Sequence, residues 1–300
     1  MVLTDLGASL LARLRNQSKV TGLSYQGCLQ LFCQEEFLRR LSLSRFNKNF
    51  ILKGGLFIYT LTEFNSRATQ DIDFLINNLS SDSTKIEEIM IEISQVNTNN
   101  SYIKLELQSI ELITPDREYQ GVSIKFVGLI KHVRVPFSID VGVDDVIVPH
   151  SIKRRIKTRL EGFDEPEIYT YSIESTIAEK FDSILKRMEA TSRMKDFFDI
   201  YYLSNLYDFN GSLLQKAIWS TIKHRNTEFD IDCFERIMKF KENSIMLSQW
   251  ARFKPLVQLD LPSFEIVLNQ IEKFIRPVFE ASIYDNEYTM TWLSETCEWR

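Results

Sequence analysis

The sequence has little of the residues that usually hold zinc or form disulfide bonds. Its 300 residues include four cysteines and three histidines. The cysteines form no Cys-x-x-Cys pair and the histidines lie far apart, so a structural zinc site is not expected. Such sparse cysteine usage suits a reducing compartment, where cysteines serve as small apolar side chains.

Basic charge and long apolar runs are also missing. The net charge is −5, so the overall composition does not indicate nucleic-acid binding, and a nucleic-acid partner would need a local basic patch. No run approaches the roughly 20 apolar residues that span a bilayer. The first residues include Asp5 and two arginines and do not resemble a signal peptide. We therefore expect a cytoplasmic protein without a membrane partner.

The composition that remains is typical of a globular protein. Hydrophobic residues make up 44% and charged residues 26% of the chain, which allows a sizeable core in one large domain or two ordinary ones. No internal repeat is present. Changes in pattern along the chain predict an N-terminal helical cap over residues 1–49, a catalytic core over 50–150 and a helical domain over 151–300.

Apolar periodicity predicts an α+β fold, with a small mixed sheet and flanking helices followed by helices. Residues 151–160 are expected to be a basic connector, and Pro136 suggests an edge position or a bulge. In the first half we expect helices at about 3–41, 56–61 and 84–96, and strands at 50–53, 70–76, 103–113, 122–128 and 132–143. In the second half we expect helices at 172–189, 194–207, 212–224, 232–243 and 263–275.

The acidic strand at residues 70–76 is the most informative segment. Side chains alternate along a strand, so Asp71 and Asp73 share one face while Ile72 and Phe74 share the other. Two neighbouring carboxylates repel unless a cation or a proton lies between them. Mg²⁺ commonly binds one or two carboxylates together with a substrate phosphate. The pair is consistent with phosphoryl or nucleotidyl transfer, or with solvated acids at a strand end.

Two further features could complete such a site. Gly54 and Gly55 lie between a strand and a helix, where glycine lets a phosphate approach the backbone and the helix N-terminus favours anions; a tight turn without a ligand is the alternative. Asp140 lies on the polar side of the strand at 132–143. It could be a third metal-binding carboxylate or one more surface acid.

Cationic and hydroxyl side chains add to the pattern. Arg67 could clamp triphosphate oxygens, and the Thr69 hydroxyl could contact a phosphate or be modified. Lys180 lies at the margin of an apolar helical face, where it could reach a triphosphate or extend to solvent. Asp196 and Asp199 are neighbours on a helix and could be functional acids or first-turn charges.

The order of these segments resembles a known family. The run KGG, then RATQDIDF, a later strand aspartate, ESTIAEKFD and RMKDFFDIYYL resemble the AbiEii/AbiGii-like nucleotidyltransferase toxins of bacterial abortive-infection and toxin–antitoxin systems. The resemblance covers about Phe50 to Leu206, roughly half of the chain. Four separated motifs in one order make it specific, and the tail beyond Asn210 shows no motif that we can assign.

The resemblance implies a polymerase-β-type nucleotidyltransferase core that uses Mg²⁺ or Mn²⁺ and a nucleoside triphosphate. It assigns catalysis to Asp71, Asp73, Lys180 and Asp196. Nucleotide binding is assigned to Lys53, Gly54, Gly55, Arg67 and Thr69, and metal binding to Asp71, Asp73 and Asp140. The Gly-Gly pair replaces the Gly-Ser of most polymerase-β relatives, and Thr69 stands where the family often has serine.

The family also implies a biological role. We expect a toxin of phage defence that transfers a nucleotide to RNA, with the 3′ end of tRNA as the expected acceptor, and so blocks translation. A cognate antitoxin is the expected protein partner. Two alternatives stay open, namely transfer onto a protein side chain and a regulatory module that binds the nucleotide without turnover.

Overall fold

The computed structural model describes residues 5–80, 82–113, 121–254, 257 and 259–300. The chain divides into two compact units. The sheet unit comprises Met1–Asp144 and Ile152–Thr170, and the helical unit comprises Asp145–Ser151 and Tyr171–Arg300. The chain therefore passes between the units three times, and the N-terminal helices belong to the same unit as the sheet.

The sheet unit places two N-terminal helices ahead of a mixed sheet. Residue 3, where the first helix was expected to begin, lies outside the described residues. The helices are α1 (Leu6–Thr21), α2 (Tyr25–Leu43), α3 (Gly54–Leu61) and α4 (Ser83–Gln95). The strands are β1 (Phe50–Lys53), β2 (Asp71–Ile76), β3 (Ile103–Ile113), β4 (Gly121–Ile130), β5 (Val133–Gly142), β6 (Ile152–Arg155) and β7 (Glu167–Thr170).

The described strands of this unit form a seven-stranded sheet in the order β3-β4-β5-β2-β1-β7-β6. The pairs β2–β5 and β1–β7 are parallel and the other pairs are antiparallel. The prediction of a mixed sheet with flanking helices is confirmed. The five strands expected between residues 50 and 143 all form, with bounds shifted by at most two residues.

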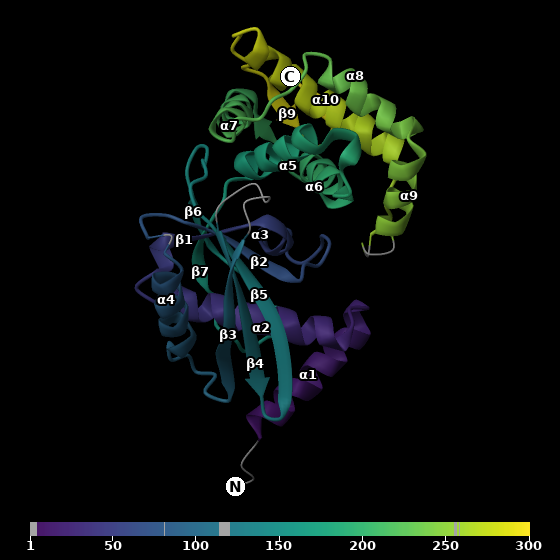
Figure 1. The fold of residues 1–300 in the computed structure, drawn as a ribbon. Helices are drawn as coiled ribbons and strands as arrows, with labels where there is room; N and C mark the ends of the chain where they lie inside the picture. The colour runs from purple at the N-terminus through teal and green to yellow at the C-terminus, as the bar shows by residue number, and fades with distance from the viewer. Residues whose placement is uncertain (1–4, 81, 114–120, 255–256, 258) are drawn as a thin grey trace. The chain divides into compact units, whose positions relative to one another are not determined.

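One face of the sheet packs against α2. Phe74 of β2 and Phe126 of β4 are fully buried, and their ring centroids lie 6.2 and 5.7 Å from that of Phe37 on α2. Figure 1 shows α2 crossing the sheet at β3, β4 and β5. Burial of these side chains stabilises the unit, because each large aromatic side chain removes an extensive apolar surface from water.

Helix α2 also buries a cluster of charges. The Glu36 carboxylate accepts bonds from Arg39 Nε at 2.9 Å and Arg40 Nε at 3.1 Å, and from Thr98 and Asn100 at 2.7 Å each. Arg40 in turn donates to the carbonyl of Ile103 at 2.7 Å. Buried charges are tolerated when they are paired and hydrogen-bonded, so this cluster ties α2 to the start of β3 in one arrangement.

The helical unit is built from helices with a small three-stranded sheet, which confirms the expected helical C-terminal part. Figure 1 shows α8 alongside α10. None of the described helices combines the length and apolarity needed to cross a bilayer. Its elements are α5 (Ile173–Arg187), α6 (Met194–Leu206), β8 (Phe209–Asn210), α7 (Gly211–His224), α8 (Cys233–Met238), α9 (Ser244–Phe253), α10 (Phe264–Ile283), β9 (Thr291–Leu293) and β10 (Glu298–Trp299).

Two predictions, for residues 151–160 and for Pro136, concern the edges of the sheet. The expectation of a connector over residues 151–160 is wrong in part, because Ile152–Arg155 form β6 at the edge of the sheet. The strand is paired antiparallel with β7, and Glu167 of β7 also accepts from Lys153 and Arg155 at 3.0 Å each across the pair. Pro136 lies in β5 opposite Val127 of β4. On its other side, the described pairing of β5 with β2 begins only at Ser138. It is thus a local edge position, as expected.

Glu35 gives the sheet unit a predicted pH dependence. Burial raises the pKa of this carboxyl to about 7, against the opposing charges of Arg39 and Arg159. The folded state therefore holds a proton that the unfolded state releases near pH 4.5, so stability falls as the pH rises from about 4.5 to 7. We expect this group to lower the free energy of unfolding by about 3 kcal/mol across that window.

The measurement is urea unfolding of the wild type and of Glu35→Gln at pH 5 and pH 8. The wild type should lose about 2.5 kcal/mol more than the variant between the two pH values. Glu165→Gln, at an exposed position, is the control and should behave as the wild type. An equal loss in wild type and Glu35→Gln would contradict the assignment.

Candidate active site

Strand register brings the predicted acids together on the face opposite α2. Asp73 of β2 is paired with Lys53 of β1 on one side and with Asp140 of β5 on the other. Paired residues of adjacent strands point to the same face, so these three side chains form a row. Asp71, two residues earlier, lies on the same face beside Ser138. The structure thus places Asp71, Asp73 and Asp140 on one face of the sheet, with Asp73 and Asp140 directly paired.

Two serines that the sequence analysis missed orient these carboxylates. Ser138 donates to Asp71 Oδ1 and Ser123 donates to Asp140 Oδ1, each at 2.6 Å. Both serines lie on a strand next to that of their partner, β5 and β4 respectively. Such hydrogen bonds fix the direction of a carboxylate that binds a cation. The signal that would have identified both serines is the strand register, which a single sequence does not show.

The two glycines lie directly beside the acidic row. Gly54 has a φ of +67°, and a Cβ built on it would lie 2.0 Å from Asp73 Oδ2. A Cβ on Gly55 would lie 2.8 Å from Thr69 Oγ1 and 3.5 Å from Arg67 Nη1. The predicted residues Gly54, Gly55, Arg67, Thr69 and Asp73 are therefore neighbours, and only a backbone without side chains fits between them.

Helix α3 begins at this point. Its N-cap is Lys53, whose side chain is buried and makes no capping hydrogen bond to the helix. The first backbone N–H groups of a helix lack partners within the helix, and the helix dipole favours an anion at this end. The glycines thus place backbone donors next to the carboxylates, an arrangement suited to a metal-bound phosphate.

The donor set agrees with a metal shared with a substrate. In the described part of the chain, no three His, Cys, Asp or Glu side chains are grouped so as to enclose a metal ion. Mg²⁺ commonly takes one or two carboxylates and completes its shell with water and phosphate oxygens. The adjacent Asp73 and Asp140, with Asp71 two residues away, provide that kind of incomplete set.

Lys180 and Asp196 belong to the helical unit, where they meet each other. Lys180 Nζ on α5 lies 2.9 Å from Asp196 Oδ1 and 3.1 Å from Asp199 Oδ2 on α6. Asp196 Oδ2 also accepts from Ser183 at 2.9 Å and Arg193 Nε at 2.7 Å. Lys180 is therefore buried in an ion-paired cluster and does not extend to solvent.

The electrostatics of this cluster follow from its pairing. Burial alone raises the pKa of Asp196, but the charges of Lys180 and Arg193 outweigh burial and hold its pKa well below the usual range. Asp196 is consequently ionised at neutral pH and stabilises the charged form of Lys180. The roles assigned to both residues by the family resemblance stay predictions.

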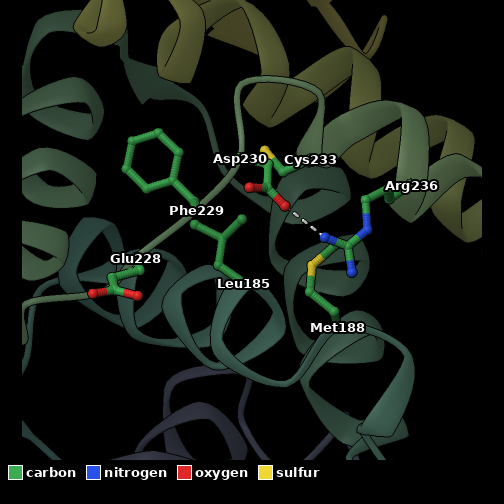
Figure 2. Close-up of a pocket in the computed structure, with 7 residues that line it drawn as sticks. All are labelled: Leu185, Met188, Glu228, Phe229, Asp230, Cys233 and Arg236. Atoms are coloured by element: carbon green, nitrogen blue, oxygen red, sulfur yellow. Dashed lines mark hydrogen bonds and ion pairs between the residues drawn. The ribbon is translucent and has the colours of Figure 1, made fainter.

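The helical unit also contains a pocket of about 380 Å³, shown in Figure 2. Leu185, Phe229 and Cys233 contribute apolar surface, and Arg236 pairs with Asp230 at 2.7 Å at its rim. The residues predicted for catalysis, nucleotide binding and metal binding do not line this pocket. Its lining is Leu185, Met188, Glu228, Phe229, Asp230, Cys233 and Arg236.

The chain is similar to known proteins at the level of family and of fold. The family model described as "Nucleotidyl transferase AbiEii toxin, Type IV TA system" matches residues 36–271, more than half of the chain. No curated protein matches.

Solved structures that are similar to this chain include MenT4 and JHP933. MenT4, a nucleotidyltransferase toxin from Mycobacterium tuberculosis, shares 15% sequence identity, with 92% of this chain and 99% of that chain covered and a TM-score of 0.54. JHP933 from Helicobacter pylori shares 13% identity, with 87% and 95% covered and a TM-score of 0.48. At such identity, the likeness to MenT4 shows a shared fold.

Gly54→Ala tests the close approach to Asp73. Its Cβ would overlap the Asp73 carboxylate, and alanine at positive φ is strained, so we expect a loss of about 2–4 kcal/mol in the free energy of unfolding. Gly162→Ala is the matched control, because Gly162 also has a positive φ, of +81°, but no atom lies within 4 Å of its Cβ position. Urea unfolding of both variants is the measurement, and equal losses would contradict the described contact.

Proposed function

Because the chain belongs to the AbiEii family of nucleotidyl transferase toxins of type IV toxin–antitoxin systems, we propose that it transfers a nucleotide from a nucleoside triphosphate to RNA. The proposed acceptor is the 3′ end of tRNA, whose modification would block translation in the cytoplasm. Mg²⁺ or Mn²⁺ is the proposed cofactor. A cognate antitoxin and a role in phage defence are part of the same proposal.

The observation that carries this proposal is the row of acids beside the glycine turn. Asp73 is in register with Asp140, Asp71 shares their face, and the Gly54 backbone contacts Asp73. Neighbouring carboxylates next to a helix N-terminus suit a cation that is bound to a phosphate. Solvated acids at a strand end would need neither the glycines nor the serine hydrogen bonds.

The reaction follows from this arrangement. Asp71, Asp73 and Asp140 would hold the metal, which when bound neutralises phosphate charge and aligns the attacking and leaving oxygens. The backbone at Gly54 and Gly55 would bind the phosphates. The side chains proposed to bind the phosphates are Lys53, Arg67 and Thr69.

In the transfer itself, an acceptor hydroxyl oxygen forms a bond to the α-phosphorus. The bond between that phosphorus and the bridging oxygen breaks, pyrophosphate leaves, and the hydroxyl proton passes to solvent. Lys180 is proposed to neutralise developing charge. Most of the rate would come from positioning and electrostatic stabilisation, because phosphoryl chemistry requires little covalent participation by the protein.

Asp71→Ala and Asp73→Ala are expected to abolish nucleotide transfer, because each removes a carboxylate from the row. Purified protein is incubated with each labelled nucleoside triphosphate and with either bulk tRNA or total protein, and growth arrest is scored in cells. Asp164→Ala, at an exposed acid of the same unit, is the control and should retain activity.

The two acceptor mixtures separate the possible functions. Label in the tRNA supports the proposal, and label only in protein would replace RNA by a protein acceptor. Absence of pyrophosphate release with every triphosphate would favour a regulatory module that binds without turnover. Full toxicity of both alanine variants at equal expression would remove the metal-dependent mechanism.

The role of Lys180 is tested with a substitution that keeps the positive charge. Lys180→Ala would leave Asp196 and Asp199 buried without their shared cation, at a cost of about 3–5 kcal/mol in the free energy of unfolding. Lys180→Arg retains a cation for both aspartates but displaces the ammonium, so we expect a folded protein with transfer reduced about a hundredfold or more. Wild-type turnover in a folded Lys180→Arg would limit Lys180 to stabilising the helical unit.

A further inference from the structure

Arg225 is the centre of a buried charge network in the helical unit. It follows the last residue of α7, and its Nη2 lies 2.6 Å from Asp145 Oδ2 and 2.7 Å from Glu179 Oε1. Its Nη1 lies 3.1 Å from Asp182 Oδ2. The side chains of Arg225, Asp145 and Asp182 are at most 4% exposed. One guanidinium thus bridges three carboxylates away from water.

The three carboxylates come from two parts of the chain. Glu179 and Asp182 lie on α5, whereas Asp145 is the first residue of the segment Asp145–Ser151, where the chain enters the helical unit. The hydroxyl of Tyr171, where the chain re-enters this unit, donates to Glu179 at 3.3 Å. Arg225 therefore joins α5 to a connecting segment.

The segment Asp145–Ser151 is attached to α5 at a second residue, Val148, so that the contacts form a closed ring. The Val148 amide donates to Ser175 Oγ at 2.8 Å, and the Val148 carbonyl accepts from Ser172, the N-cap of α5. The segment is held at Val148 by the start of α5 and at Asp145 by Arg225. Loss of the contact between Asp145 and Arg225 would open the ring and leave Val148 as the described attachment.

The same helix carries Lys180 on the adjacent side. Residues three apart share one side of a helix, so Glu179 and Asp182 lie along one stripe, and Lys180 and Ser183 lie along the next. The first stripe is bound by Arg225, and the second is bound by Asp196. These two sets of contacts together fix the rotation of α5 about its axis.

A purely stabilising contact would not require this chemistry. Apolar residues of similar volume often stabilise a core as well as or better than buried ion pairs. The planar guanidinium can bond three carboxylates at once in fixed directions, which a lysine ammonium on a flexible stem does not reproduce.

We infer that Arg225 is a positioning residue: through Glu179, Asp182 and Asp145 it fixes α5 and the connecting segment, and thereby sets the place of Lys180. The inference rests on the proposed nucleotidyl transfer, in which Lys180 takes part. Arg225 itself is not placed in contact with substrate.

The experiment breaks the ring at Asp145, because Arg225 then still has two carboxylate partners. Asp145→Ala removes one acceptor while Arg225 keeps Glu179 and Asp182, so the variant should fold. Asp145→Asn retains an acceptor oxygen and serves as the conservative variant. Arg225→Lys keeps the charge but loses the bridging fork.

Arg236→Gln is the matched control, an arginine eleven residues further on that bonds Asp230 and Glu189 at a partly exposed position, as Figure 2 shows for Asp230. Its contacts reach neither α5 residues 179 and 182 nor Asp145. We expect its transfer kinetics to match those of the wild type.

Transfer kinetics with tRNA and each triphosphate, and hydrogen exchange over residues 145–151, are measured on the full chain. We expect Asp145→Ala and Arg225→Lys to lower kcat about tenfold or more with KM for the triphosphate within about twofold, because misplacement of a reacting group mainly affects the transition state. Exchange at the Val148 amide, which donates to Ser175, should rise in Asp145→Ala, and Asp145→Asn should recover much of the kcat.

Three results would overturn the inference. One is wild-type kcat and KM in folded Asp145→Ala; another is a loss of kcat that the unfolded fraction accounts for; the third is unchanged exchange at the Val148 amide. If the wild type shows no transfer, the proposed function fails, and the exchange data still decide whether Arg225 holds this segment.

Discussion

The register of β2 between β1 and β5 is the constraint on which the candidate site depends. Phe74 and Ile72 face the core under α2, and this burial forces Asp71 and Asp73 onto the opposite face. A slip of one residue would bury both carboxylates and expose both apolar side chains, at a cost of several kcal/mol. The packing of Phe37 on one side of the sheet therefore determines where the acids lie on the other.

Much of this arrangement could be predicted from the sequence because it is local. The alternation at residues 133–143 and the run around Asp71 determine which side chains face the core, and Gly-Gly at a strand end predicts the turn into α3. The roles of Ser123 and Ser138 could not be predicted, because each depends on which residues the strand register places side by side. β6 was missed because its four residues show no apolar alternation, and the strand is recognised only from its antiparallel pairing with β7.

Buried charges are the other feature that periodicity did not predict. Glu36, Arg39 and Arg40 have the i, i+3 and i, i+4 spacing of ordinary surface pairs, yet the structure buries them under Thr98 and Asn100. Arg225 has no sequence pattern at all, because its partners lie 43 to 80 residues away. Spacing shows that charges can pair, but burial depends on contacts that form only in the folded chain.

The two sets of acids differ in what they can still bind. Asp196 uses both oxygens for Lys180, Ser183 and Arg193, and its lowered pKa makes it a poor proton acceptor. Asp71 is exposed and its described partner is the neutral hydroxyl of Ser138. A carboxylate already neutralised by two cations has little affinity for a third, whereas one held by a hydroxyl keeps its charge for a new cation. The proposed metal-binding role therefore fits the sheet unit, and Asp196 fits the task of holding Lys180 in place.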